Sequence, residues 1–181
     1  MNIIIWILVG VVVVFILWLV YAYNRLVTMR VRVREGLSDI DVQLKRRFDL
    51  IPNLIETVKG YMQHERNVLE NVTQARAQVA SSGGDPLARA DKENMLSNTL
   101  KTLFAVSENY PDLKANVNFL ELQRELSDTE NKIQASRRFY NTTVRDLNTA
   151  IETFPTNMIA GGFHFMSEKF FEVESEKEKE V

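Results

Sequence analysis

The chain has 181 residues, enough for one domain of ordinary size or for one domain with an anchor. Its 22 Lys and Arg residues against 24 Asp and Glu residues give a formal net charge of -2, which argues against a general nucleic-acid-binding protein. It has no cysteine, which excludes disulfides, thiol catalysis and zinc sites that need thiolate. Its two histidines are too few for a three-histidine metal site.

The N-terminal segment predicts a transmembrane helix. Residues Ile3–Tyr23 are nearly all apolar, and the first charged side chain is Arg25. At about 1.5 Å per residue this segment gives about 32 Å of helix, close to the roughly 30 Å of a bilayer's hydrocarbon core. The alternative is a cleaved secretory signal. It is disfavoured because the apolar run is long, no basic residue precedes it and no small-residue cleavage site follows.

The flanks of this segment predict its orientation. Four arginines follow it before the first acid, and none precedes it. The positive-inside rule then predicts a single-pass protein of the cell membrane, with its N-terminus outside and the rest of the chain in the cytoplasm. The same arginines are candidates for contact with anionic lipid headgroups at the membrane surface. They are Arg25, Arg30, Arg32 and Arg34.

The rest of the chain has the apolar periodicity of helices. Apolar residues recur at alternating steps of three and four, which predicts helices over about 24–80, 86–109 and 112–153. Pro52 is expected to kink or split the first of these, because it lacks a backbone donor. Short links between them force antiparallel neighbours. The predicted fold is therefore all-α, a transmembrane helix over 1–23 followed by a long antiparallel bundle over 24–154.

The predicted helices differ in length. The middle one is much shorter than the other two, so part of the long pair would lack a third helix of the same chain. An exposed apolar stripe of that size usually has a partner. We therefore expect the bundle to form a homo-oligomer or to bind a helix of another protein.

The C-terminal residues break this periodicity. Residues 155–171 are apolar and aromatic, and we call them the C-terminal strap. The strap is expected either to pack over the end of the bundle or to dock on a membrane or partner. Residues 172–181 carry five Glu against two Lys and predict a solvated, disordered tail.

Several polar residues lie on or beside the predicted seams. Arg46, Arg47 and Asp49 are candidates for a buried ionic cluster at the Pro52 kink, and polar seam residues can set the register of helices. For the basic run Lys45–Arg47, ion pairs inside the bundle are preferred to contact with lipid headgroups, because Asp41 and Asp49 flank the run. The complete candidate set is Asp41, Lys45, Arg46, Arg47, Asp49, Asn53, Thr129 and Asn148.

No catalytic pattern is present in the sequence. His64 and Glu65 begin an HExxH string, but Val68 stands where the second histidine would be. Ser81–Gly84 lacks the lysine of a phosphate-binding loop. We therefore expect neither enzymatic activity nor a cofactor.

Four ordered blocks resemble the signature of the LemA family of bacterial membrane proteins. They are IDVQLKRRFDLIPNL at 40–54, ENYPDLKAN at 108–116, TENKI at 129–133 with RRFYN at 137–141, and FP at 154–155 with IAG at 159–161 and FFEVE at 170–174. The resemblance implies an N-terminal anchor and a helical bundle with no established enzymatic activity. It also points to membrane metallopeptidases as partners, and one branch of the family takes part in building magnetosome membranes.

Three hypotheses of function follow. The first is a membrane-anchored scaffold or adaptor that self-assembles or binds another membrane protein. The second is a membrane-remodelling or lipid-surface protein that uses the four arginines and the strap. The third, an enzyme or enzyme regulator, has little support from the sequence in its catalytic form.

Overall fold

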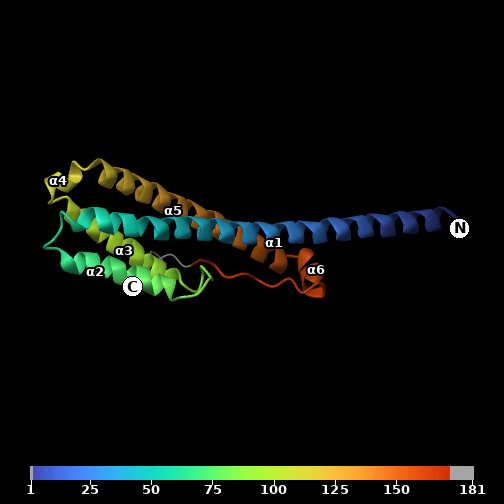
Figure 1. The fold of residues 1–181 in the computed structure, drawn as a ribbon. Coiled ribbons are helices and arrows are strands. Elements are labelled where there is room, and N and C mark those ends of the chain that lie inside the picture. Colours follow the sequence, from blue (N-terminus) through green and yellow to red (C-terminus); the bar gives the residue numbers. More distant parts are fainter. Residues whose placement is uncertain (1, 172–181) are drawn as a thin grey trace, which may run out of the picture. The chain divides into compact units, whose positions relative to one another are not determined.

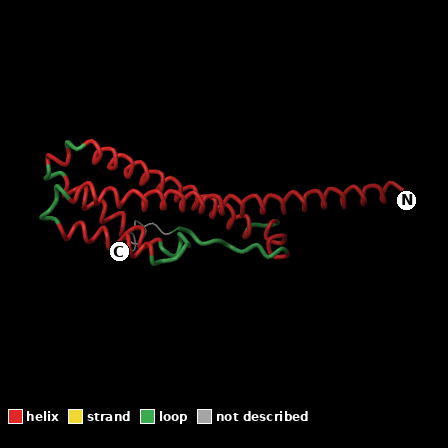
Figure 2. The backbone as a smooth tube through the Cα atoms, in the orientation of Figure 1, coloured by secondary structure: helices red, strands yellow, loops and turns green. Residues whose placement is uncertain are grey.

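The computed structural model describes residues 2–171, and within these it contains helices and connecting segments but no strand (Figures 1 and 2). The all-helical prediction is confirmed for this part of the chain. The predicted acidic tail, 172–181, lies outside the described residues. The helices are α1 (Asn2–Lys59), α2 (Arg66–Ala80), α3 (Ala90–Ser107), α4 (Pro111–Lys114), α5 (Val117–Glu152) and α6 (Thr156–Gly162).

The apolar N-terminal segment is the first part of α1. This helix is long and apolar enough to cross a membrane, and none of its most apolar stretch is buried within the protein. A core helix of a soluble protein would instead be covered by its neighbours. The segment therefore fits a single-pass membrane protein.

The predicted helix over 24–80 is divided in the structure, but not at Pro52, where the sequence predicted a kink or a split. Pro52 lies inside α1, which continues to Lys59, and the break falls between Lys59 and Arg66. Proline leaves the carbonyl of residue i-4 without its helical donor. Here that carbonyl belongs to Phe48, and it accepts a hydrogen bond from Nε of Arg76 at 3.3 Å. The tertiary contact thus replaces the missing bond.

α3 begins at Ala90, after the predicted start at about residue 86, whereas α4 begins at Pro111, close to the predicted start at about residue 112. A turn over 81–89 precedes α3, with Oδ1 of Asp85 accepting from the Leu87 amide at 3.0 Å. The third predicted helix is divided into α4 and α5. Oδ1 of Asn116 caps the start of α5 by accepting from the Phe119 amide at 3.0 Å.

Two compact units share α1 and α5. The first unit comprises Met1–Gly36 and Phe139–Phe170. Its two long helix segments lie close together at Gly36, where an added Cβ would lie 3.2 Å from the backbone Cα of Tyr140. Within the described residues this unit has no third long helix, and the strap, which includes the short helix α6, contacts the α1 and α5 segments instead. Its buried apolar side chains are Ala22, Leu26, Val33, Tyr140, Val144, Leu147, Ile159, Ala160 and Phe165.

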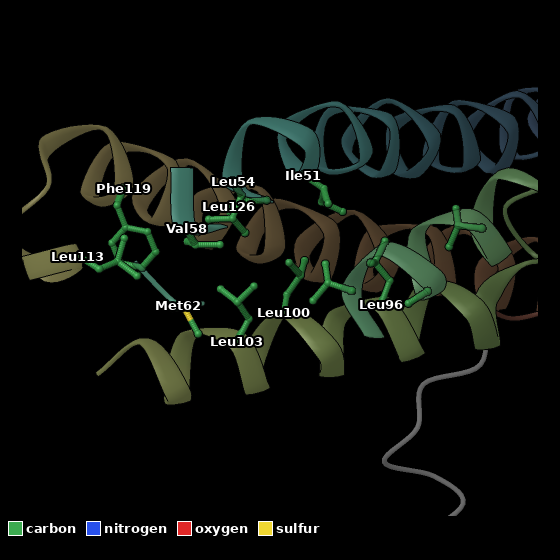
Figure 3. Packing of buried hydrophobic residues seen from close by; sticks show 13 residues of the cluster. Ile51, Leu54, Val58, Met62, Leu96, Leu100, Leu103, Leu113, Phe119 and Leu126 are labelled. Atoms are coloured by element: carbon green, nitrogen blue, oxygen red, sulfur yellow. The ribbon is translucent and has the colours of Figure 1, made fainter. Parts of the chain in front are cut away.

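The second unit comprises Leu37–Arg138 and Phe171–Val181, of which residues up to Phe171 are described. Here α2 and α3 form an antiparallel hairpin that covers the α1 and α5 segments (Figure 1). Their apolar faces meet in one core (Figure 3). Its members include Ile51, Leu54, Val58, Met62, Val72, Leu96, Leu100, Leu103, Leu113, Phe119 and Leu126.

Candidate functional site

An arginine lies at the centre of the second unit's helix packing. Arg47 is 1% exposed, although it carries a full charge. It follows Leu44 by three residues and precedes Ile51 by four, and both of these side chains are buried. The inward-facing stripe of α1 therefore passes through Arg47 and not through its neighbour Phe48.

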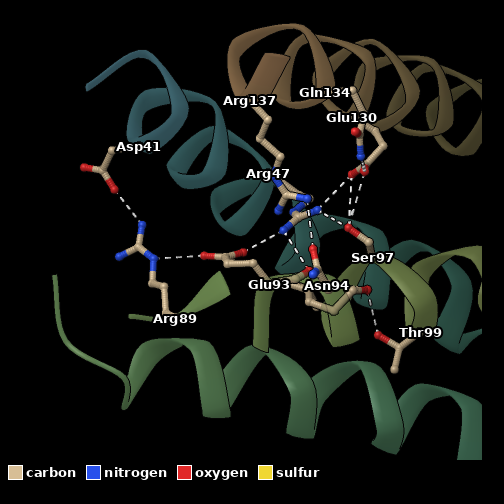
Figure 4. Close-up of polar contacts among 11 residues, drawn as sticks. Asp41, Arg47, Arg89, Glu93, Asn94, Ser97, Thr99, Glu130, Gln134 and Arg137 are labelled. Atoms are coloured by element: carbon tan, nitrogen blue, oxygen red, sulfur yellow. Dashed lines mark hydrogen bonds and ion pairs between the residues drawn. The ribbon is translucent and has the colours of Figure 1, made fainter. Parts of the chain in front are cut away.

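The guanidinium of Arg47 joins three helices (Figure 4). Its Nη2 donates to Oε2 of Glu93 on α3 at 2.6 Å and to the Glu93 carbonyl at 3.1 Å. Its Nη1 donates to Oε2 of Glu130 on α5 at 2.8 Å, and to Oγ of Ser97. Hydrogen bonds between charged groups are the strong ones in proteins, and bonds from one fork to two helices also set their register.

A second arginine extends this network toward the surface. Nη2 of Arg89 donates to Oδ1 of Asp41 at 2.5 Å, and its Nε pairs with Oε1 of Glu93 at 3.1 Å. Glu93, which is almost fully buried, thus lies between two arginines. We call Asp41, Arg47, Arg89, Glu93, Ser97 and Glu130 the buried ionic cluster.

Glu130 is the half-buried carboxylate of this cluster. Burial alone would raise its pKa, but the positive charge of Arg47 opposes this. Hydrogen bonds from Gln134, Arg47 and Ser97 act in the same direction as that charge. The pKa of Glu130 therefore lies below its ordinary value of 4.5, and the folded protein favours the carboxylate form.

The predicted cluster at Pro52 contains too many residues. Of Arg46, Arg47 and Asp49, only Arg47 is buried. Arg46 is exposed and lies 4.0 Å from Glu125, also substantially exposed, which is a weak arrangement. The helical turn of about 100° per residue explains this, because neighbours of a seam residue face away from the seam.

The remaining candidates are dispersed. Lys45 and Asn53 are exposed on α1. Thr129 is buried on the seam of α5, but its hydroxyl donates to the Glu125 carbonyl of its own helix at 2.7 Å. Asn148 lies in the first unit and contacts the strap.

The sequence candidates include none of the three residues to which Arg47 donates, Glu93, Ser97 and Glu130. Glu93 lies on the apolar stripe of α3, three residues before Leu96. An acid at that position was a detectable signal for a buried charge. The pairing itself was not detectable, because Arg47 and Glu93 are 46 residues apart in sequence.

An open groove adjoins the buried ionic cluster. It has a volume of about 660 Å³ and lies along α3 and α5, with Arg47, Ser97 and Glu130 at its lining. Four of its lining side chains are apolar, and charged side chains of both signs stand among them. The other lining residues are Leu100, Lys101, Phe104, Leu120, Gln123, Arg124, Leu126, Ser127, Asp128 and Asn131.

The strap is held along α5 by polar contacts. The side-chain amide of Asn148 pairs with the backbone of Glu168, donating to its carbonyl and accepting from its amide at 2.9 Å each. The hydroxyl of Tyr140 donates to the Lys169 carbonyl at 2.8 Å. These contacts pack Glu168 and Lys169 of the strap against α5.

The four arginines after the apolar segment do not all face outward. Arg25, Arg32 and Arg34 are exposed, but Arg30 is half-buried, and its guanidinium lies 4.9 Å from the centroid of the Phe165 ring. Arg30 therefore contributes a cation–π contact to the packing of the strap.

Within residues 2–171, no group of three or more His, Cys, Asp or Glu side chains is placed to hold a metal ion. The charged groups of the buried ionic cluster are paired with each other. This arrangement has the chemistry of a structural network.

Comparison with known proteins gives consistent matches. The model of the LemA family matches residues 36–181. The chain is 28% identical to Protein LemA of Metamycoplasma hominis over 137 residues, 76% of this chain and 63% of the relative. It is 24% identical to Magnetosome protein MamQ of Magnetospirillum gryphiswaldense over 173 residues, 82% of this chain and 64% of the relative. The chain thus spans somewhat less than two thirds of both relatives.

Proposed function

Because this chain belongs to the LemA family, we propose that it is a non-enzymatic, membrane-anchored scaffold or adaptor that assembles with itself or with another integral membrane protein. The observation that carries this proposal is the buried ionic cluster. Its charged side chains bind one another across three helices, so they stabilise the arrangement of the helices that form the protein's surface. The apolar start of α1 supplies the anchor.

The groove along α3 and α5 is the surface that suits a partner helix. Leu100, Phe104 and Leu120 can make apolar contacts with such a helix. Lys101, Arg124 and Asp128 supply charges that can select one partner over another. A helix of a second copy or of a membrane metallopeptidase would fit this description.

The proposed topology places the N-terminus outside and the bundle in the cytoplasm. It rests on the positive-inside rule and on the exposed positions of Arg25, Arg32 and Arg34. Contact of these three side chains with anionic headgroups is part of the proposal.

Membrane remodelling is the second candidate function. The relatives named as magnetosome proteins favour it. Under this proposal the protein would act on the lipid surface itself, and assembly would serve to concentrate it there.

The test is purification of the tagged full-length protein from native membranes in mild detergent, with mass spectrometry of its companions and a measurement of total mass. A stoichiometric integral protein or a homo-oligomer is expected. A Leu120→Glu variant should lose that companion or oligomer, because it places a charge on the groove wall. Val42→Glu is the matched control, since Val42 is exposed on α1 and does not line the groove. A bare monomer without companions would overturn the scaffold proposal.

A further inference from the structure

The segment around α6 combines features that the scaffold proposal does not use. Residues 153–167 contain no Asp, Glu, Lys or Arg, although 25% of the whole chain is charged. Several of their large apolar side chains are exposed. Phe154 is 79% exposed, Met158 70% and Phe163 53%.

The inner face of this segment is packed. Ile159 and Ala160 of α6 are buried, as are Ala22 and Leu26 of α1 in the same unit. Phe154, Met158 and Phe163 are exposed on the same segment, and exposing such apolar side chains to water is unfavourable. The patch that they form needs an apolar environment to cover it.

The position of the segment along α1 identifies that environment. The ring of Phe163 lies 4.8 Å from the ring of Tyr23, measured between centroids, and Phe165 lies 5.9 Å from it. Tyr23 is the last residue of the apolar segment. Thr156 of α6 and Arg25, the first charged residue after that segment, line the same small groove. The segment therefore lies beside α1 (Figure 1), at the end of its apolar segment.

We infer that α6 and its flanks form a second membrane contact, in which Phe154, Met158 and Phe163 insert into the boundary between headgroups and acyl chains. Apolar side chains of interfacial elements enter this layer by about 5–10 Å, and aromatic rings are favoured there. Lipid is favoured over a protein occupant because the patch continues the lipid-facing surface of α1. The absence of charge over 153–167 removes the usual barrier to insertion. The inference rests on the proposed membrane anchor and is independent of self-assembly.

The experiment uses tryptophan as a depth probe in the full-length protein. The chain has only two tryptophans, Trp6 and Trp18, both in the apolar segment. Replacing both with Phe and adding Met158→Trp makes a single-tryptophan protein, which is reconstituted into phosphatidylcholine vesicles brominated near the top of one acyl chain. We expect blue-shifted emission that loses most of its intensity relative to unbrominated vesicles. Met95→Trp in the same background is the control, because Met95 is an exposed methionine of α3.

A third protein separates failure of the anchor from failure of the inference. It carries Trp18→Phe alone, so that Trp6 reports insertion of α1. Quenching of Trp6 without quenching at position 158 would overturn the α6 contact and leave the anchor standing. Blue-shifted but unquenched emission at position 158 would also overturn it, since the probe would be covered by protein. Equal quenching at positions 95 and 158 would show unspecific lipid contact and would overturn it too.

Discussion

Arg47 places a full positive charge in an apolar helix seam, where desolvation is costly. Two carboxylates and a hydroxyl compensate for this by accepting from both ends of its fork. A network of this kind stabilises one register of three helices, because a shift of any helix would leave a buried charge without its partner. The residue thus determines the arrangement of the bundle more than an apolar side chain would.

We expect Arg47→Met to destabilise the protein by about 3–5 kcal/mol, because it leaves Glu93 buried with one of its two cations removed. The measurement is urea unfolding of the full-length protein in mild detergent, followed by circular dichroism. Arg46→Met is the matched control and should cost less than about 1 kcal/mol, since Arg46 is exposed. Equal effects of the two substitutions would contradict a special role of Arg47.

The lowered pKa of Glu130 predicts a dependence of stability on pH. The folded state favours the carboxylate, so its contribution is fully present above the ordinary pKa of 4.5 and disappears as the pH falls below it. Glu130→Gln should remove this part of the acid sensitivity. Melting temperatures of both proteins between neutral and acidic pH provide the test, and parallel curves would exclude Glu130 as a contributor.

Among the helices, a side chain of α2 binds α1 one turn before Pro52. Arg76 of α2 donates to the Phe48 carbonyl and lies 3.9 Å from the centroid of the Phe48 ring. It therefore fixes α2 against the part of α1 that Pro52 weakens. The Phe48 carbonyl, which Pro52 leaves without a helical donor, is thus a point of contact with α2.

The strap is an element that depends on a few polar contacts. Asn148→Ala removes both bonds to Glu168, each worth about 0.5–1.5 kcal/mol. We expect faster amide hydrogen exchange in residues 163–171 and little change in the core of the second unit. Asn131→Ala is a suitable control on the same helix, because Asn131 is exposed and belongs to the second unit. Unchanged exchange in the strap would show that these bonds do not hold it.

At the scale of the whole molecule, the proposed topology predicts on which side of the membrane each part of the chain lies. Because the chain has no cysteine, single introduced cysteines can test this. Ser81→Cys places the only thiol in the exposed loop after α2. We expect a membrane-impermeant maleimide to label it in inverted vesicles but not in intact cells. Asn2→Cys should show the opposite pattern. Labelling of position 81 from outside intact cells would reverse the assigned orientation.

The anchor and the helical class follow from the sequence alone. A contiguous apolar segment is a one-dimensional property, and it needs no knowledge of packing to be recognised. The alternating steps of three and four reflect the geometry of the helix itself, so they reveal helices and their inner faces. The LemA signature is likewise read along the chain.

Only the tertiary structure decided which residues meet. The pairing of Arg47 with Glu93 and Glu130 depends on how three helices align, and no local pattern encodes that alignment. The hydrogen bond to the carbonyl that Pro52 leaves without a helical donor comes from Arg76, which lies 28 residues from Phe48. The strap is bound to α5 by Asn148, 20 residues before Glu168. The physical reason is the same in all three cases. The energy of burying a polar side chain depends on partners that are distant in sequence. Helical periodicity and the apolar length of a membrane span, by contrast, depend on residues that are close together in sequence.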